Sequence, residues 1–375
     1  MGWEPMKYYI IAGEASGDLH GSNLIKELHL LDAGANIRCW GGDLMQAAGA
    51  TLVKHYRDLA FMGFTEIIMN LKTILNNLKF CKQDILQFQP DVVVFIDYPG
   101  FNLRMTEWAK ENGYKTVFYI SPQVWAWKEN RVPKMKRTID KMLVILPFEK
   151  EYYKNKWGWE VEYVGHPLVK VIDEERSKVK SEKLSNKGVI ALLPGSRKQE
   201  ILKKLPIMLE VSKLFPQFQF IVAQAPGQED SFYKTMLQPF NNVSSVSNQT
   251  YNLLKQSRAA LVTSGTATLE TALFGVPEVV CYKGSSISYQ IAKRLIKVKY
   301  ISLVNLIMDR LVVKELIQND LTAENLAGEL TGLLNNVERR KQLEVDYQSL
   351  KNILSAGGDA SARAAKSIYE FINRG

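Results

Sequence analysis

The sequence predicts an α/β protein of two doubly wound domains with parallel sheets, and three observations support this fold class. The chain has 375 residues, which exceeds the usual length of a domain with a single hydrophobic core. Short apolar runs alternate with helical patterns along its length, as parallel sheets require because their crossovers contain helices. A strand, a glycine turn and a helix follow one another near residue 7 and again near residue 189. We therefore expect one Rossmann-like unit in each half.

The predicted strands place the domain boundaries. The first strand, Lys7–Ala12, leads into the loop Gly13–Asp18 and a helical pattern through Leu31. The other predicted buried strands are Val92–Ile96, Thr116–Ile120, Met142–Leu146, Val189–Leu193, Gln219–Ala223, Ala259–Thr263 and Glu278–Tyr282. The charged stretch Asp173–Lys187 is the expected linker.

This boundary predicts three parts of the chain. Residues 1–170 form an N-terminal domain, in which residues 1–5 are interpreted as an extension, and residues 188–350 form a second domain. In the last part, 351–375, an Ala-rich helical pattern runs from Asp359 to Ile372. We expect this helix to pack back on the N-terminal domain or on a partner.

Composition and charge exclude several classes of protein. Hydrophobic residues make up 46% and charged residues 23% of the chain, so a disordered or fibrous protein is not expected. Three scattered cysteines and four histidines without HExxH spacing predict neither a disulfide framework nor a catalytic zinc. The absence of a signal pattern and of an apolar run of roughly 18–20 residues predicts a cytoplasmic protein. The net charge of +9 favours an anionic partner: nucleic acid, a phospholipid surface or a phosphorylated substrate.

A turn in the second half has the composition of a phosphate site. Gly195, Ser196 and Arg197 follow a predicted strand and open a helix, so that backbone N–H groups and a guanidinium can meet an anion. The Walker and dinucleotide glycine motifs are absent from it. An ordinary turn with a solvated arginine is an equally good interpretation of this segment alone.

A second turn repeats this arrangement. Ser264, Gly265 and Thr266 follow a strand, and Ser264 or Thr266 can cap the next helix. Glu270, one turn further on, can accept hydrogen bonds from the hydroxyls of a ribose. An N-cap followed by a solvated glutamate is the alternative, but two anion-receptive turns in one domain favour a nucleotide diphosphate.

The first half carries candidate catalytic carboxylates. Asp97 ends a predicted apolar strand, where partial desolvation raises its pKa and suits it to take a proton from an alcohol. Glu14, in the first glycine loop, can approach it across the strand ends. An N-cap is the alternative role for Asp97. Since no Asp-x-Asp sequence occurs, we expect no metal at the diphosphate.

Two segments of the first half can contact lipid. A helical stripe from Phe61 to Phe88 packs on the sheet, but its surplus apolar residues and Lys72, Lys79 and Lys82 also suit a surface that enters lipid head groups. The stretch from Trp125 to Arg137 is aromatic and basic. Solvated charge is its alternative interpretation, and an anionic lipid fits both segments together.

Seven motifs together resemble the lipid-A-disaccharide synthase family. They are Gly13–Asp18, Ile96–Asn102, Ser121–Trp127, Leu146–Glu149, Gly165–Pro167, Leu193–Arg197 and Ser264–Glu270. Their number, order and spacing make the set specific, and the resemblance runs from about residue 7 to the C-terminal helix. It departs from the family pattern at Val304, where proline is frequent, and at Leu311, where an acidic residue is frequent.

The resemblance implies a GT-B glycosyltransferase with two Rossmann-like domains facing each other across a cleft. Its activity joins UDP-2,3-diacylglucosamine to 2,3-diacylglucosamine 1-phosphate, giving a β-1′,6-linked disaccharide phosphate and UDP, with no cofactor. One inversion at the anomeric carbon implies a single displacement. It also implies a peripheral enzyme on the cytoplasmic face of the inner membrane. Either a monomer or a homodimer is compatible with the resemblance.

The resemblance also implies residue roles. Asp97 matches the family's acceptor-side carboxylate. Either Asp97 or Glu14 can be the general base, and we expect Asp97 to accept the proton with assistance from Glu14. The substrate-binding residues are Gly195, Ser196, Arg197, Ser264, Gly265, Thr266, Glu270, Asn305, Arg310, Ser16, Asn102, Trp125 and Met62. The segment 61–82 corresponds to the membrane and acyl-chain surface.

Three alternatives come from other classes. A UDP-N-acetylglucosamine 2-epimerase has the same two-domain architecture but needs no acyl-binding surface. A non-enzymatic lipid or nucleotide binding module would bind without releasing UDP. Nucleic-acid binding rests on positive charge alone and ranks last.

Overall fold

The computed structural model describes residues 5–59, 71–126, 128–178, 182–226, 228–284 and 299–373. The chain divides into two compact units. The first comprises residues 1–167 and 355–375, and the second comprises residues 168–354. Among the described residues, no helix combines the length and apolar character needed to cross a membrane.

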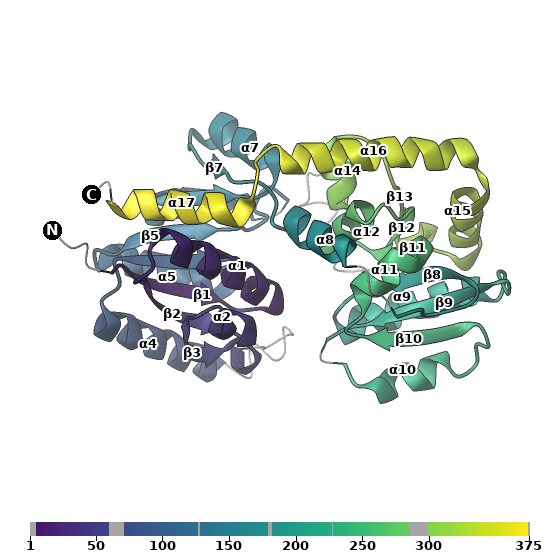
Figure 1. Cartoon of the computed structure of the whole chain (residues 1–375), viewed down its shortest axis with the longest axis horizontal. Helices are drawn as coiled ribbons and strands as arrows, with labels where there is room; N and C mark the ends of the chain where they lie inside the picture. Colours follow the sequence, from purple (N-terminus) through teal and green to yellow (C-terminus); the bar gives the residue numbers. More distant parts are fainter. Residues whose placement is uncertain are drawn as a thin grey trace. The chain divides into compact units, whose positions relative to one another are not determined.

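The first unit is built on a seven-stranded parallel sheet in the order β3-β2-β1-β4-β5-β6-β7 (Figure 1). Its strands are β1 (Lys7–Ala12), β2 (Asn36–Gly41), β3 (Thr51–His55), β4 (Val92–Ile96), β5 (Lys115–Tyr119), β6 (Lys141–Val144) and β7 (Glu162–Tyr163). Its helices are α1 (Ala15–Leu31), α2 (Asp43–Ala47), η1 (Tyr56–Leu59), α4 (Leu71–Phe88), α5 (Pro99–Glu111), η2 (Glu129–Arg131), α6 (Val132–Thr138), α7 (Pro147–Trp157) and α17 (Ala360–Asn373). All residues of β4 are buried, as its continuous Val-Val-Val-Phe-Ile sequence predicts.

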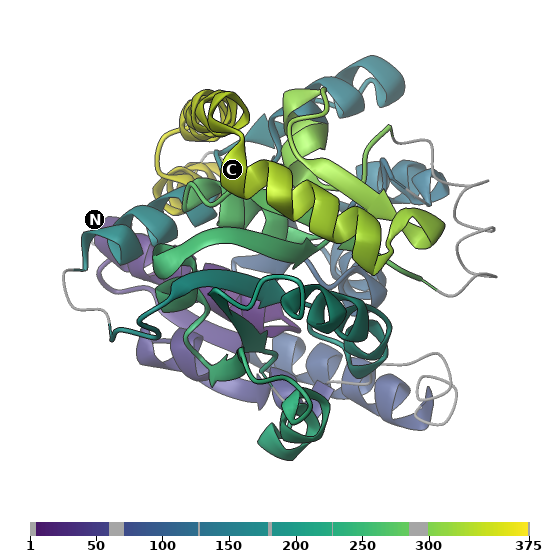
Figure 2. The ribbon, with the colours of Figure 1, turned by 90° about the vertical axis from the view of Figure 1, so that its right-hand side faces the viewer.

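The second unit has a six-stranded parallel sheet in the order β10-β9-β8-β11-β12-β13. Its strands are β8 (Gly188–Leu193), β9 (Phe218–Gln224), β10 (Val243–Ser247), β11 (Ser257–Thr263), β12 (Glu278–Tyr282) and β13 (Lys314–Ile317). Its helices are α8 (Leu168–Ser177), α9 (Lys198–Ser212), α10 (Asp230–Leu237), α11 (Thr250–Gln256), α12 (Thr266–Leu273), α14 (Leu303–Met308), η3 (Gln318–Asp320), α15 (Ala323–Asn335) and α16 (Val337–Ser355). Figure 2 shows α15 lying across this sheet, where it contacts β11, β12 and β13.

The limits of the two units correct the predicted linker. Its first residues, from Asp173, lie within α8, which begins the second unit. Leu168 and Ile172, one helical turn apart, are buried in that unit, so this stretch is a packed helix. The second unit also extends through residue 354, beyond the predicted limit of 350.

The C-terminal helix α17 packs on the first unit of its own chain, alongside α1 (Figure 1). The Oγ of Ser367 donates a hydrogen bond of 2.6 Å to Glu162 of β7, and Lys115 of β5 donates one of 2.9 Å to the Ile372 carbonyl. The last helix therefore completes the core of the unit that begins the chain.

Candidate active site

The candidate carboxylates lie at the topological switch point of the first sheet. Strand β1 neighbours both β2 and β4, and Ala12 of β1 pairs with Ile96 of β4. The next residues, Gly13 and Asp97, therefore leave the sheet side by side at its carboxyl edge. In open α/β sheets, ligands bind at this position.

The backbone holds Asp97 in a strained turn. Asp97 and Tyr98 have φ angles of 45° and 49°, in the left-handed region that non-glycine residues rarely occupy. The Asp97 N–H donates to the Tyr119 carbonyl of β5 at 3.1 Å. Helix α5 begins at Pro99 with Tyr98 as its N-cap, so the interpretation of Asp97 as the N-cap is wrong.

The surroundings of Asp97 raise the pKa of its carboxyl to about 6. Burial is the main cause, the negative charge of Glu14 adds to it, and a hydrogen bond from the Tyr98 backbone opposes it. A Cβ added at Gly13 would lie 2.2 Å from the Tyr98 ring, so only glycine lets the loop before Glu14 approach this turn. The structure thus brings Glu14 and Asp97 into electrostatic contact.

Asn102 and Ser16 occupy different environments beside this turn. Asn102 is fully buried, and its Nδ2 lies within hydrogen-bond distance of the carbonyls of Asp97, Ile96 and Ile11, at 2.7, 3.3 and 3.4 Å. It therefore ties the ends of β1 and β4 together and positions Asp97. Ser16 is exposed in the first turn of α1.

Trp125 packs against a buried acid. Its Nε1–H donates to Glu149 at 3.1 Å, its ring meets Phe148 edge-on, and the side chain is 8% exposed. The backbone N–H of Leu146 donates to the other carboxyl oxygen of Glu149 at 3.1 Å. Burial raises the pKa of Glu149 to about 8. The motif Leu146–Glu149 predicts no role for Glu149 in the site, although a Glu two residues after a helix-opening Pro is a capping signal.

The first candidate phosphate turn lies at the switch point of the second sheet. Strand β8 lies between β9 and β11, and Leu193 pairs with Val262. Gly195 has a φ of 119°, which favours glycine. Arg197 is the N-cap residue of α9, and its side chain is 61% exposed and 3.8 Å from Glu200. Its guanidinium is therefore available to a ligand.

The second turn lies beside the first but differs from the prediction. Helix α12 begins at Thr266, and its N-cap is Gly265, with φ 126° and no side-chain cap. The prediction that Ser264 or Thr266 caps the helix is therefore wrong, because the chain turns at a residue without a side chain. The first turn of α12 keeps the positive end of its dipole without a capping oxygen.

Glu270 lies in α12, and its alternative interpretation as a solvated residue is wrong. Its Oε1 accepts a hydrogen bond of 2.9 Å from the Tyr251 hydroxyl. Burial raises the pKa of Glu270, and the bond from Tyr251 opposes this shift. Among the described residues, Oε2 has no hydrogen-bond partner, so one oxygen can accept from a ligand.

Asn305 and Arg310 are committed to contacts within the second unit. The Asn305 amide donates to the Val313 carbonyl and to Glu315, both at 2.9 Å, and its oxygen accepts from two backbone N–H groups. Arg310 forms a bidentate ion pair with Asp346, with nitrogen–oxygen distances of 2.5 and 3.1 Å. Asn305 therefore has no hydrogen-bonding capacity left for a ligand in this structure, and it positions its loop.

Part of the predicted lipid surface lies in α4. Met62 and Trp127 fall outside the described residues. Helix α4 packs on the core through Cys81 and Ile85, whereas Leu75, Phe80 and Leu86 are 54%, 45% and 49% exposed. The helix thus packs on the sheet, as predicted, and also presents apolar side chains to its surroundings.

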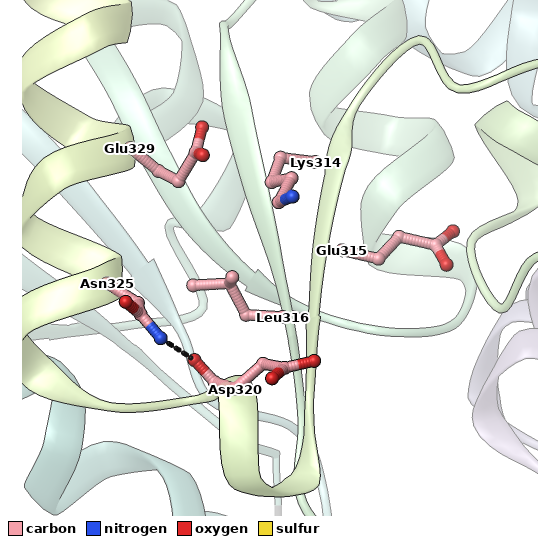
Figure 3. A pocket seen from close by; sticks show the side chains of 6 residues that line it. All are labelled: Lys314, Glu315, Leu316, Asp320, Asn325 and Glu329. Atoms are coloured by element: carbon pink, nitrogen blue, oxygen red, sulfur yellow. Dashed lines mark hydrogen bonds between the residues drawn. The ribbon is translucent and has the colours of Figure 1, made fainter.

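A cavity of about 320 Å³ lies apart from both turns of the second unit. It is lined by residues of the edge strand β13, η3 and α15 (Figure 3), namely Lys314, Glu315, Leu316, Asp320, Asn325 and Glu329. None of these residues belongs to the predicted site.

Two parallel α/β units with candidate site residues at their switch points have the fold of GT-B glycosyltransferases and related epimerases. The structure of UDP-GlcNAc 2-epimerase from Neisseria meningitidis bound to UDP-GlcNAc has a TM-score of 0.71 and 14% identity, covering 99% of this chain and 100% of that one. The glycosyltransferase of kitacinnamycin has a TM-score of 0.68 and 15% identity, covering 98% and 100%. The prediction of two Rossmann-like α/β domains is confirmed.

Sequence comparison identifies the family. The family model described as lipid-A-disaccharide synthetase matches residues 8–370. The lipid-A-disaccharide synthases of Syntrophus aciditrophicus and Geobacter metallireducens are each 37% identical, covering 97% of both chains and 100% of both chains respectively. This chain belongs to the lipid-A-disaccharide synthase family. The predicted glycosyltransferase class is confirmed, and the epimerase alternative is not favoured.

Proposed function

We propose that the chain joins UDP-2,3-diacylglucosamine to 2,3-diacylglucosamine 1-phosphate, with release of UDP. The observation that carries this proposal is the setting of Asp97, a carboxylate at the switch point whose pKa of about 6 suits a general base near neutral pH. Asp97 accepts the proton of the acceptor's 6-hydroxyl as the oxygen attacks the anomeric carbon. The bond from that carbon to the diphosphate breaks in the same step, so the α-linked donor gives a β-linked product.

The second unit receives the leaving nucleotide. Arg197 and the uncapped start of α12 offer a guanidinium and backbone N–H groups to the diphosphate, and the free oxygen of Glu270 offers an acceptor to the ribose. These groups meet the charge that develops on departing UDP, which is the task of electrostatic stabilisation in such a step. The proposed reaction needs no metal.

We also propose peripheral binding to the inner membrane through the segment 61–82. Its described part supports this, because Leu75 and Phe80 are exposed beside the exposed Lys72 and Lys79. Apolar side chains flanked by lysines suit an interface with anionic lipid head groups.

Release of UDP tests the proposed reaction. Purified protein is mixed with UDP-2,3-diacylglucosamine, with and without the acceptor lipid phosphate, in buffer with and without EDTA. We expect UDP only when the acceptor is present, at a rate that EDTA leaves unchanged. UDP release without acceptor would contradict the transferase, and loss of activity in EDTA would contradict the metal-free step.

The acid limb of the pH profile tests the pairing of Glu14 with Asp97. The kcat/KM of the wild-type enzyme should fall as the pH drops through about 6, because Asp97 must be ionised to accept a proton. The charge of Glu14 raises the pKa of Asp97, so Glu14→Gln should move this fall to lower pH. Glu111→Gln, an exposed acid on α5, should leave it in place. An unshifted limb in Glu14→Gln would show that the two carboxylates do not interact.

A further inference from the structure

Lys204 of α9 is a buried cation at the carboxyl edge of the second sheet. Its side chain is 4% exposed, whereas that of its neighbour Lys203 is exposed. An ammonium group is rarely buried without full pairing, because its desolvation is costly. The position of Lys204 therefore calls for a compensating group.

Among the described residues, the neighbouring groups balance the charge and the hydrogen-bond donors of Lys204 only in part. Its Nζ donates a hydrogen bond to Thr263 Oγ1. The nearest carboxylate oxygen, Glu200 Oε2, is 4.0 Å away, beyond hydrogen-bond distance, and Glu200 also lies 3.8 Å from Arg197. Among the described residues, two of the three N–H groups of Lys204 have no acceptor. The single carboxylate of Glu200 therefore lies near two cations, Lys204 and Arg197.

Lys204 also lies at the junction of the two anion-receptive turns. Thr263, its hydrogen-bond partner, is the last residue of β11 and precedes the turn at Ser264. On the other side, a Cβ added at Gly195 would lie 3.5 Å from Nζ. The ammonium therefore lies between the end of β11 and the Gly195–Arg197 turn.

We propose that Lys204 is a buried counter-charge that binds the diphosphate of the donor nucleotide, together with Arg197. The inference rests on the proposed function, since it adds a residue to the same donor site. An anion bound at the two turns accepts hydrogen bonds from the free N–H groups of Lys204. It also balances the positive charge that Glu200 leaves uncompensated on Lys204 and Arg197. In its absence, burial lowers the pKa of Lys204, while the charge of Glu200 opposes the shift.

Lys204→Met tests this assignment, with Lys203→Met as the matched control. Methionine keeps the length and the apolar stem of the buried side chain but removes the charge. By isothermal titration calorimetry, Lys204→Met should bind UDP about tenfold or more weakly than wild type, as expected for a lost charged hydrogen bond. Lys203→Met should bind UDP normally.

Thermal unfolding without UDP separates binding from a purely structural role. We expect Lys204→Met to melt at or above the wild-type temperature, because replacing an incompletely paired buried charge by an apolar group is often neutral or stabilising. A lower melting temperature with unchanged UDP affinity would make Lys204 a structural residue and overturn the proposal. Failure of the wild-type protein to bind UDP would contradict the proposed function. If wild type binds UDP and Lys204→Met binds it equally well, only the assignment of Lys204 is contradicted.

A second variant, Lys204→Gln, keeps the proposal testable if Lys204→Met does not fold. The glutamine amide can still donate a hydrogen bond but carries no charge, whereas the lysine ammonium donates to Thr263 Oγ1. Folded Lys204→Gln should bind UDP about tenfold or more weakly than wild type, because the charged hydrogen bond is lost. Wild-type UDP affinity in this variant would overturn the proposal.

Discussion

Asp97→Asn is expected to lower turnover by about two to four orders of magnitude, the usual contribution of a general base. The amide has the shape of the carboxylate but cannot accept the proton of the acceptor hydroxyl. The affinity for UDP should not change, because Asp97 belongs to the first unit and the proposed UDP groups belong to the second. Steady-state rates and UDP calorimetry measure the two effects separately.

Asp58→Asn provides the control for this result. Asp58 lies in η1 of the same unit, its side chain is 59% exposed, and its ion pair with Lys54 spans 3.8 Å. Loss of such an exposed pair has little effect, so the variant should keep wild-type turnover. An Asp97→Asn enzyme with a near-normal rate would remove Asp97 from the role of base.

Arg197→Ala is expected to weaken UDP binding by about tenfold to a hundredfold, the range for loss of hydrogen bonds to a charged group. The guanidinium is exposed and only loosely held by Glu200 at 3.8 Å, so it is free to pair with a diphosphate. The fold should not change, because Arg197 has no ion-pair partner other than Glu200 within the described residues. Calorimetry with UDP measures the loss.

Arg340→Ala is the matched control for Arg197→Ala. Arg340 is an exposed arginine of α16 in the same unit, so its loss changes the net charge of the unit equally. The control should bind UDP normally. Equal affinity of wild type and Arg197→Ala, or an equal loss in Arg340→Ala, would contradict a specific contact between Arg197 and UDP.

Most strands inside the two sheets could be predicted from the sequence, whereas the interior strand β2 and the edge strands could not. The run Glu278–Tyr282 has the observed bounds of β12, because the uninterrupted apolar residues after Glu278 are typical of a strand covered on both faces. Strand β10 escaped prediction because its sequence, Val-Ser-Ser-Val-Ser, is largely polar and partly exposed. Edge strands such as β10 gain their order from one neighbouring strand, which no local pattern reveals.

The predicted site residues followed from strand ends, while their partners depended on tertiary structure. Asp97 and Arg197 could be found because each follows an apolar strand. The pairing of Lys204 with Thr263 joins positions 59 residues apart, so spacing gives no hint of it. The cap of α12 was predicted wrongly because side-chain preference favoured Ser264 or Thr266, and the backbone instead turned at Gly265.

Analysis of the reaction product tests the central claim most directly. Wild-type protein is incubated with UDP-2,3-diacylglucosamine and the acceptor lipid phosphate, and the product is examined by NMR while the protein is examined by intact mass spectrometry. A single displacement assisted by Asp97 predicts a β-1′,6-linked disaccharide and a protein of unchanged mass at every time point. An α-linked product, or a sugar covalently attached to the protein, would contradict the account.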